Sequence, residues 1–98
     1  MKHYLLIYDF IDGYIDRRPA FRGEHLRLAW AAAARGELMM GGALSDPADT
    51  GLLLFTSTEA AEVFARDDPY VTNDLVKTWR VREWVTVAGP WAANPVQP

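Results

Sequence analysis

The chain has 98 residues, the size of one small domain, and half of them are hydrophobic, which excludes a disordered chain. Its net charge of -3 provides no basic stripe for nucleic acid or an anionic membrane surface, so we expect neither as a partner. It has no cysteine for disulfides or thiolate metal sites, no membrane-length apolar run and no signal-peptide pattern, so we expect a cytoplasmic protein.

The first half of the chain predicts a strand followed by an amphipathic helix. Residues 3–10 (HYLLIYDF) carry apolar side chains on both faces over a strand length, which is typical of a central strand. Pro19 suits the first turn of a helix that we expect to end at Arg35, just before Gly36. Helical spacing gives this helix one inward stripe, formed by Phe21, His25, Leu28, Ala29 and Ala32.

The second half of the chain predicts two strands, a second helix and a final strand. Residues 37–44 and 51–56 form the two strands, and the second of these is apolar on both faces and therefore central. A Thr-x-x-Glu capping box at Thr56 opens a helix that we expect to end near Arg66. Residues 77–87 alternate between the two faces and indicate an edge strand.

The order of these elements is βαββαβ, which predicts a ferredoxin-like α+β fold with an antiparallel sheet. Two helices cover only one face of such a sheet, yet Leu5 and Ile7 place apolar side chains on the other face. An apolar face of this extent predicts association, most simply as a sheet-to-sheet homodimer. We expect the domain to span residues 1–89 and a Pro-rich, irregular tail to follow at 90–98.

The two histidines differ in their expected surroundings. His3 begins a strand without an acidic partner, and we interpret it as structural. His25 lies on the inward stripe beside Arg22, where burial and charge can tune a proton acceptor; the alternative is a core histidine bonded to a backbone carbonyl. Asp68 precedes Pro69 and fits an N-cap, but in the expected fold it also reaches His25 and can orient the ring.

Other kinds of site have weaker support in the sequence. With one inward histidine and no cysteine, we expect no metal site, and nothing in the chain calls for an organic cofactor. Gly41 and Gly42 precede no helix, so they do not form a phosphate loop. Arg17, Arg18 and Arg22 gather at the start of the first helix, where they can attract a carboxylate or phosphate; a solvated helix start is the alternative.

A set of short motifs runs in one order from about residue 2 to residue 89. They are Arg18, Arg22-x-x-His25-Leu26, Gly36-x-Leu38, Gly42-Ala43-Leu44-x-Asp46, Phe64-x-x-x-Asp68-Pro69-Tyr70-Val71 and Trp79-x-Val81-x-x-Trp84. In this order, on a βαββαβ pattern, the chain resembles YciI-like proteins of the YCII-related domain family. It departs from the family pattern at Asp74, where that pattern usually has a glycine that permits positive φ.

The resemblance implies a dimeric α+β barrel with a pocket in which His25 and Asp68 are the catalytic pair. The substrate-binding residues that it implies are Arg22, Asp9, Arg18 and Tyr70. Superfamily relatives are similar to muconolactone isomerases and dehydrochlorinases of aromatic breakdown, so the implied activity is cofactor-independent acid–base chemistry of the lyase or isomerase type. The implied ligand is a small anionic or phenolic compound. The alternative is a non-catalytic small-molecule-binding or accessory dimer; an oxygenase on the same barrel has the least support.

Overall fold

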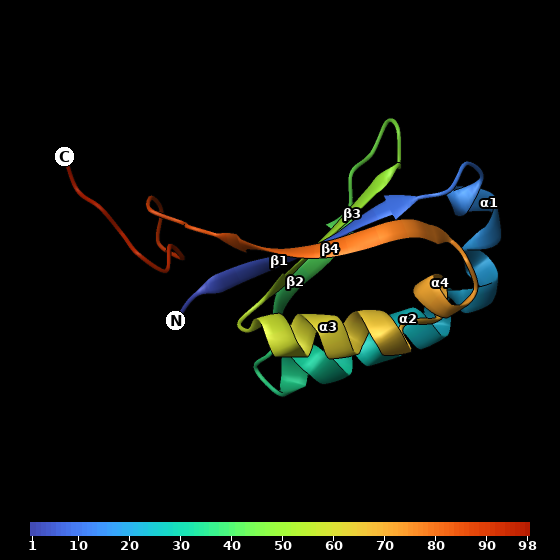
Figure 1. Ribbon diagram of the computed structural model, residues 1–98, viewed down its shortest axis with the longest axis horizontal. Helices are drawn as coiled ribbons and strands as arrows, with labels where there is room; N and C mark the ends of the chain where they lie inside the picture. The colour runs from blue at the N-terminus through green and yellow to red at the C-terminus, as the bar shows by residue number, and fades with distance from the viewer.

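The computed structural model describes residues 1–98 as a four-stranded antiparallel sheet with helices against one face (Figure 1). The elements in chain order are β1 (His3–Phe10), α1 (Tyr14–Arg17), α2 (Pro19–Ala34), β2 (Leu38–Ala43), β3 (Thr50–Phe55), α3 (Thr58–Asp67), α4 (Pro69–Thr72) and β4 (Val76–Trp84). The strand order β2-β3-β1-β4 places the two most apolar strands at the centre, as predicted. With the short α1 and α4 added, the βαββαβ order confirms the ferredoxin-like α+β fold.

Alternation along β1 separates the core from the opposite side of the sheet. Leu6, Tyr8 and Phe10 are buried beneath the helices, whereas Leu5 and Ile7 point the other way and remain partly exposed. The core extends from these buried residues to α2, α3 and α4 through Ala32, Phe64, Tyr70 and others. No helix of the chain combines the length and apolar character needed to cross a bilayer.

A glycine on β3 fixes the position of the aromatic side chains at one end of β1. Gly51 pairs with Tyr8, and a Cβ atom at Gly51 would lie 2.8 Å from the ring of Phe10. Real Cβ atoms do not approach so closely, so only glycine leaves room for the ring here. Phe10 in turn stacks on Tyr14, with ring centroids 3.6 Å apart and planes inclined by 7°. Tyr14 of α1 is thereby held beside the sheet.

The start of α3 differs from the prediction by one residue. Ser57, not Thr56, is the N-cap, and its Oγ accepts a hydrogen bond from the backbone N–H of Ala60 at 3.1 Å. Thr56 instead donates its hydroxyl to the carbonyl of Gly36 at 3.2 Å. The predicted capping box is therefore wrong, because Thr56 serves to tie the end of β3 to the turn before β2.

Two other details of the backbone bear on the predictions. Asp74 has a φ of 63°, so the position where the family pattern usually has glycine does adopt the left-handed conformation. β4 ends at Trp84, three residues earlier than expected, because the chain beyond it bonds to its own tail. Asn94 N–H donates to the carbonyl of Thr86 at 2.9 Å, and the Thr86 hydroxyl bonds to the ring of buried His3.

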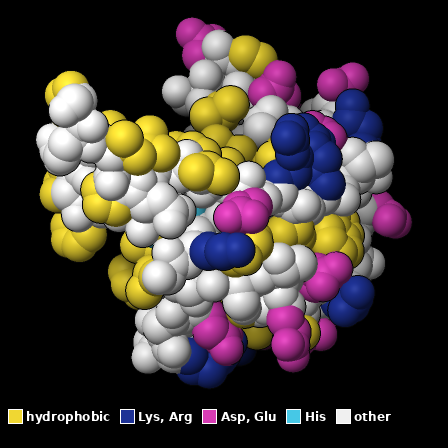
Figure 2. Space-filling view, turned by 60° about the vertical axis from the view of Figure 1, so that its left-hand side comes forward, with side chains coloured by type: hydrophobic (Ala, Val, Ile, Leu, Met, Phe, Trp, Pro, Cys, Tyr) yellow, Lys and Arg dark blue, Asp and Glu magenta, His cyan; other side chains and the backbone are white.

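One face of the sheet is left without a helical cover, and we call it the open face. Its apolar side chains are Leu5, Ile7, Met40, Leu52, Leu54 and Trp84. The C-terminal segment carries further exposed hydrophobic side chains, namely Val85, Val87, Trp91 and Val96. Figure 2, in which the side that carries both chain termini in Figure 1 comes forward, shows hydrophobic side chains at the surface. Half of the residues are hydrophobic, and in the monomer many of them lie exposed on the open face and in the C-terminal segment.

Candidate functional site

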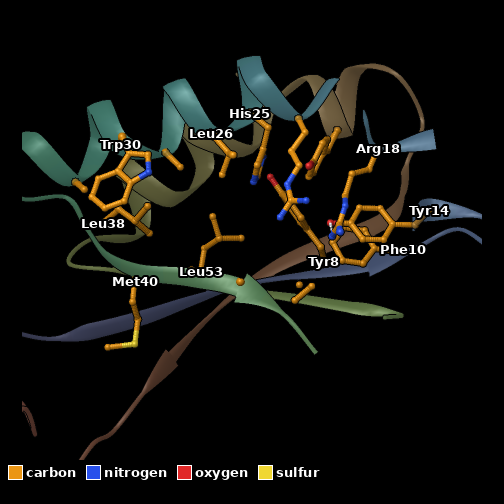
Figure 3. A pocket seen from close by; sticks show the side chains of 18 of the residues that line it. Tyr8, Phe10, Tyr14, Arg18, His25, Leu26, Trp30, Leu38, Met40 and Leu53 are labelled. Atoms are coloured by element: carbon orange, nitrogen blue, oxygen red, sulfur yellow. Dashed lines mark hydrogen bonds between the residues drawn. The ribbon is translucent and has the colours of Figure 1, made fainter. Parts of the chain in front are cut away.

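A cavity of about 430 Å³ lies between α2 and the sheet, on the side that the helices cover (Figure 3). Thirteen of the 19 residues that line it are hydrophobic, and a few polar side chains converge on it. Mostly apolar walls with a few polar groups are the usual composition of a small-molecule site. His25 points from α2 into this cavity, while Tyr8 lies below it on β1.

The structure brings His25 and Asp68 together across 43 residues of chain. The His25 Nδ1 atom lies 2.9 Å and 3.0 Å from the two carboxylate oxygens of Asp68. Because a carboxylate accepts hydrogen bonds, Nδ1 carries the hydrogen and, in the neutral ring, Nε2 keeps its lone pair. Nε2 of His25 has no hydrogen-bond partner within the protein. Because every buried side-chain nitrogen and oxygen has one, Nε2 is not buried and opens onto the cavity that His25 lines. The backbone-carbonyl alternative for His25 is not what the chain adopts.

Asp68 is fully buried and receives hydrogen bonds from three directions. Besides His25, its donors are the Tyr8 hydroxyl at 2.7 Å and the Tyr70 backbone N–H at 3.0 Å. The Tyr70 contact is the predicted N-cap of α4, so Asp68 caps a helix and orients the histidine at once. The carboxylate consequently has one position, and it fixes the tautomer of His25.

Tyr8 is the one member of this network that sequence reasoning missed. Burial, then the negative charge of Asp68 and the hydrogen bond to it, raise the pKa of Tyr8 well above its usual range. The hydroxyl therefore stays protonated and remains a donor to the carboxylate. The signal in the sequence was a tyrosine hydroxyl at an even position of β1, a feature that Tyr8 shares with Tyr4.

Tyr70 supports the histidine ring from the side. The two rings are stacked, with centroids 3.9 Å apart and planes inclined by 8°, and the edge of Phe64 meets His25 at 5.9 Å. Burial, followed by the influence of neighbouring Tyr14, raises the pKa of Tyr70, so its phenol is neutral. Tyr70 borders the cavity, and the face of its ring is a platform for His25.

Two of the three arginines at the helix start reach the same cavity. The Arg18 guanidinium lies 5.3 Å above the ring of Tyr14 and donates to its hydroxyl at 3.4 Å, whereas the Arg22 side chain makes no hydrogen bond or ion pair within the protein. Arg17 points elsewhere and donates to the carbonyl of Asn73 at 3.1 Å. No acidic side chain lines the cavity. The two arginines therefore have no acidic partner within the lining, which favours an anionic ligand.

The structure does not bring Asp9 to this site. Its carboxylate accepts hydrogen bonds from Thr78 Oγ1 at 2.7 Å and from Arg80 at 3.2 Å, and Asp9 does not line the cavity. The expectation that Asp9 neighbours His25 and Asp68 is wrong because odd positions of β1 face away from the helices. No three histidine, aspartate or glutamate side chains gather anywhere in the chain as metal ligands would.

The fold and the site together define a ferredoxin-like α+β protein whose cavity holds an oriented His–Asp pair between the sheet and the helices. The family model of the YCII-related domain matches residues 1–85, and the chain belongs to this family. The match covers the whole of the sheet and all four helices. The chain is therefore a YciI-like protein, as its motifs predicted.

Two solved structures share the fold. A 5-chloro-2-hydroxyhydroquinone dehydrochlorinase from Burkholderia phenoliruptrix AC1100, in complex with 2,5-dihydroxybenzoquinone, superposes with a TM-score of 0.70 and 17% identity over 86% of this chain and 94% of that one. Protein Atu4242 from Agrobacterium tumefaciens superposes with a TM-score of 0.58 and 11% identity over 95% and 98%. At these identities the likeness shows the fold alone. The comparison with curated proteins gives no match.

Proposed function

We propose that this protein is a cofactor-independent enzyme of the lyase or isomerase type that moves a proton on a small anionic or phenolic compound. One observation carries the proposal: Asp68 holds Nδ1 of His25 at 2.9 Å and 3.0 Å, which leaves Nε2 as the free nitrogen in a cavity with two arginines. Its cysteine-free chain also supports a cytoplasmic location.

Each polar group has one role in the proposed reaction. Arg18 and Arg22 bind the anionic group of the substrate, and His25 Nε2 takes up the proton as general base. Asp68 stabilises the imidazolium ion that forms, because its carboxylate already faces Nδ1. Tyr8 keeps the carboxylate in place by its hydrogen bond to Oδ2.

Elimination of HCl from a hydroxylated chloroarene fits these roles, and the dehydrochlorinase with the same fold supports that choice. The substrate reacts as its keto tautomer, in which the carbon that carries chlorine has gained the proton of one ring hydroxyl. Nε2 removes the proton of a second ring hydroxyl, the O–H electron pair forms a new C=O bond, and the electron pair of the neighbouring C=C bond shifts to form a double bond to the chlorine-bearing carbon. Chloride leaves with the electron pair of the C–Cl bond, and Nε2 later returns its proton to solvent. The net change is loss of one HCl, with no oxidant or reductant.

The first test of the proposal is a chloride-release assay. The purified protein is incubated with a panel of chlorinated hydroquinones that includes 5-chloro-2-hydroxyhydroquinone, and free chloride is measured against time. We expect release in proportion to protein concentration for at least one compound. If every compound that binds is recovered unchanged, and without deuterium after incubation in D₂O, the domain is a binding protein and the proposal fails.

We also propose that the open face is the interface of a homodimer. Leu5, Ile7 and Leu52 form its centre, and no element of the chain covers them. Ile7→Glu is expected to yield monomers in sedimentation velocity, because it places a charge in the proposed interface. Val63→Glu, on exposed α3, is the matched control and should leave the dimer intact. A monomeric wild type, or a dimeric Ile7→Glu variant, would contradict this interface.

A further inference from the structure

The cavity has two chemically different ends, arranged along α2. Arg22 and His25 lie in the first half of this helix, whereas Leu26, Trp30 and Ala33 line the cavity further on. At about 1.5 Å per residue, Ala33 lies about 12 Å beyond His25 along the axis. Figure 3 shows the same arrangement, with Arg18 and Tyr14 at one side of the view and Trp30 and Leu38 at the other.

The strand that faces α2 continues this division. The short turn after α2 leads directly into β2, so Leu38 lies beside the C-terminal part of the helix and Ala43 toward the basic end. At the far end, Leu38 pairs with Phe55, which in turn pairs with Tyr4. At the basic end, Ala43 pairs with Gly51, whose other partner is Tyr8. The walls of the far end are therefore apolar on both sides.

The cavity is larger than a single aromatic ring requires. An apolar cavity of about 150 Å³ accommodates benzene, whereas this one measures about 430 Å³. A one-ring substrate with its anionic group between Arg18 and Arg22 would leave the far end unfilled. At that end Trp30 is 73% exposed and presents an apolar ring that a longer ligand would cover.

We propose that the ligand is an amphipathic aromatic anion: an aromatic acid or phenolate that carries an alkyl chain or a second ring. Its anionic head lies at Arg18, Arg22 and His25, and its apolar extension runs along α2 past Leu26 to Trp30. The positive charge at one end and the absence of any acidic lining residue support the head group. The inference uses the ligand site of the proposed function, but it does not depend on catalysis there.

The test measures the affinities of ligands that cannot react. Isothermal titration compares benzoate, 4-propylbenzoate and 4-pentylbenzoate, with neutral 4-pentylbenzamide as the head-group control. We expect each added methylene to lower Kd by roughly threefold, as burial of apolar surface does, up to the length of the far end. The amide should bind at least about tenfold more weakly than 4-pentylbenzoate because it lacks the charge that the arginines bind.

Two substitutions separate the two ends of the cavity. Trp30→Ala, and independently Leu26→Ala, should remove most of the gain from chain length while leaving the Kd of benzoate unchanged. Arg22→Gln should weaken benzoate and 4-pentylbenzoate by the same factor. Trp91→Ala removes a tryptophan of similar exposure in the C-terminal segment and should change neither affinity.

Three results would overturn the inference. The first is equal affinity for benzoate and 4-pentylbenzoate, and the second is an equal loss for both ligands in Trp30→Ala. The third is a Trp30→Ala variant with altered oligomeric state and unaltered affinities, which would show that a second copy of the chain covers the far end. Because the benzoates carry no leaving group, a dependence on chain length without chloride release would disprove the proposed chemistry alone.

Discussion

Replacement of His25 by Gln is expected to lower kcat by about two to four orders of magnitude while the protein remains folded. Glutamine keeps an amide N–H that can donate to Asp68, but it has no group that accepts a proton near neutral pH. The side chain of His25 is 14% exposed and borders the cavity, so a glutamine of similar size can take its place without leaving a large hole in the core. The loss is measured as chloride release, with circular dichroism as the check of folding.

The second histidine of the chain provides the matched control for this result. His3→Gln alters a buried ring that bonds to Thr86, on β1 and away from the cavity lining. Its turnover should stay within about twofold of the wild type, because it touches no group that moves a proton. If His25→Gln and His3→Gln were equally active, another residue would have to be the general base.

Asp68→Ala is expected to cause the largest loss of stability of any single change at the site, about 3–5 kcal/mol. The substitution removes the acceptor of the Tyr8 hydroxyl, the His25 Nδ1–H and the Tyr70 backbone N–H in one step. Each donor is then left without a partner in a buried environment. Urea unfolding, compared at equal protein concentration with the wild type, measures the loss.

Asp68→Asn distinguishes stability from orientation of the histidine. The asparagine carbonyl oxygen still caps α4 at Tyr70, so we expect it to recover about 1 kcal/mol or more relative to alanine. Its single acceptor oxygen cannot hold both Tyr8 and His25, however, so the ring loses its fixed tautomer. Turnover should fall about a thousandfold or more, although the fold is kept. A stable Asp68→Ala variant would show that the network does not hold this part of the core together.

Periodicity was sufficient to predict the sheet and the two long helices. The runs at residues 3–10 and 51–56 are apolar on both faces, which is typical of strands in the middle of a sheet, and β1 and β3 are the two central strands. The stripe on α2 placed His25 inward, and the fold then brought it within hydrogen-bonding distance of Asp68. The pair was thus accessible from the sequence, since α2, which carries His25, and the end of α3, which Asp68 follows, pack against the same face of the sheet.

Local pattern was insufficient where two residues competed for one role or where a contact was purely tertiary. Thr56 and Ser57 both suit an N-cap, and only the position of the preceding turn decides for Ser57. The bond between Tyr8 and Asp68 joins residues 60 apart in the chain, which no spacing rule encodes. Asp9 could have been excluded, because alternation along β1 already assigned it to the face opposite Tyr8.

The central claim is that His25, held by Asp68, is the general base of the cavity. The most direct test is the pH dependence of kcat/KM for chloride release from the best substrate of the panel, because a histidine base changes its protonation in the range from about pH 5 to 8. We predict that kcat/KM rises through a single ionisation in this range and then becomes constant. A kcat/KM that stays constant across the whole range, in protein that remains folded, would contradict the claim.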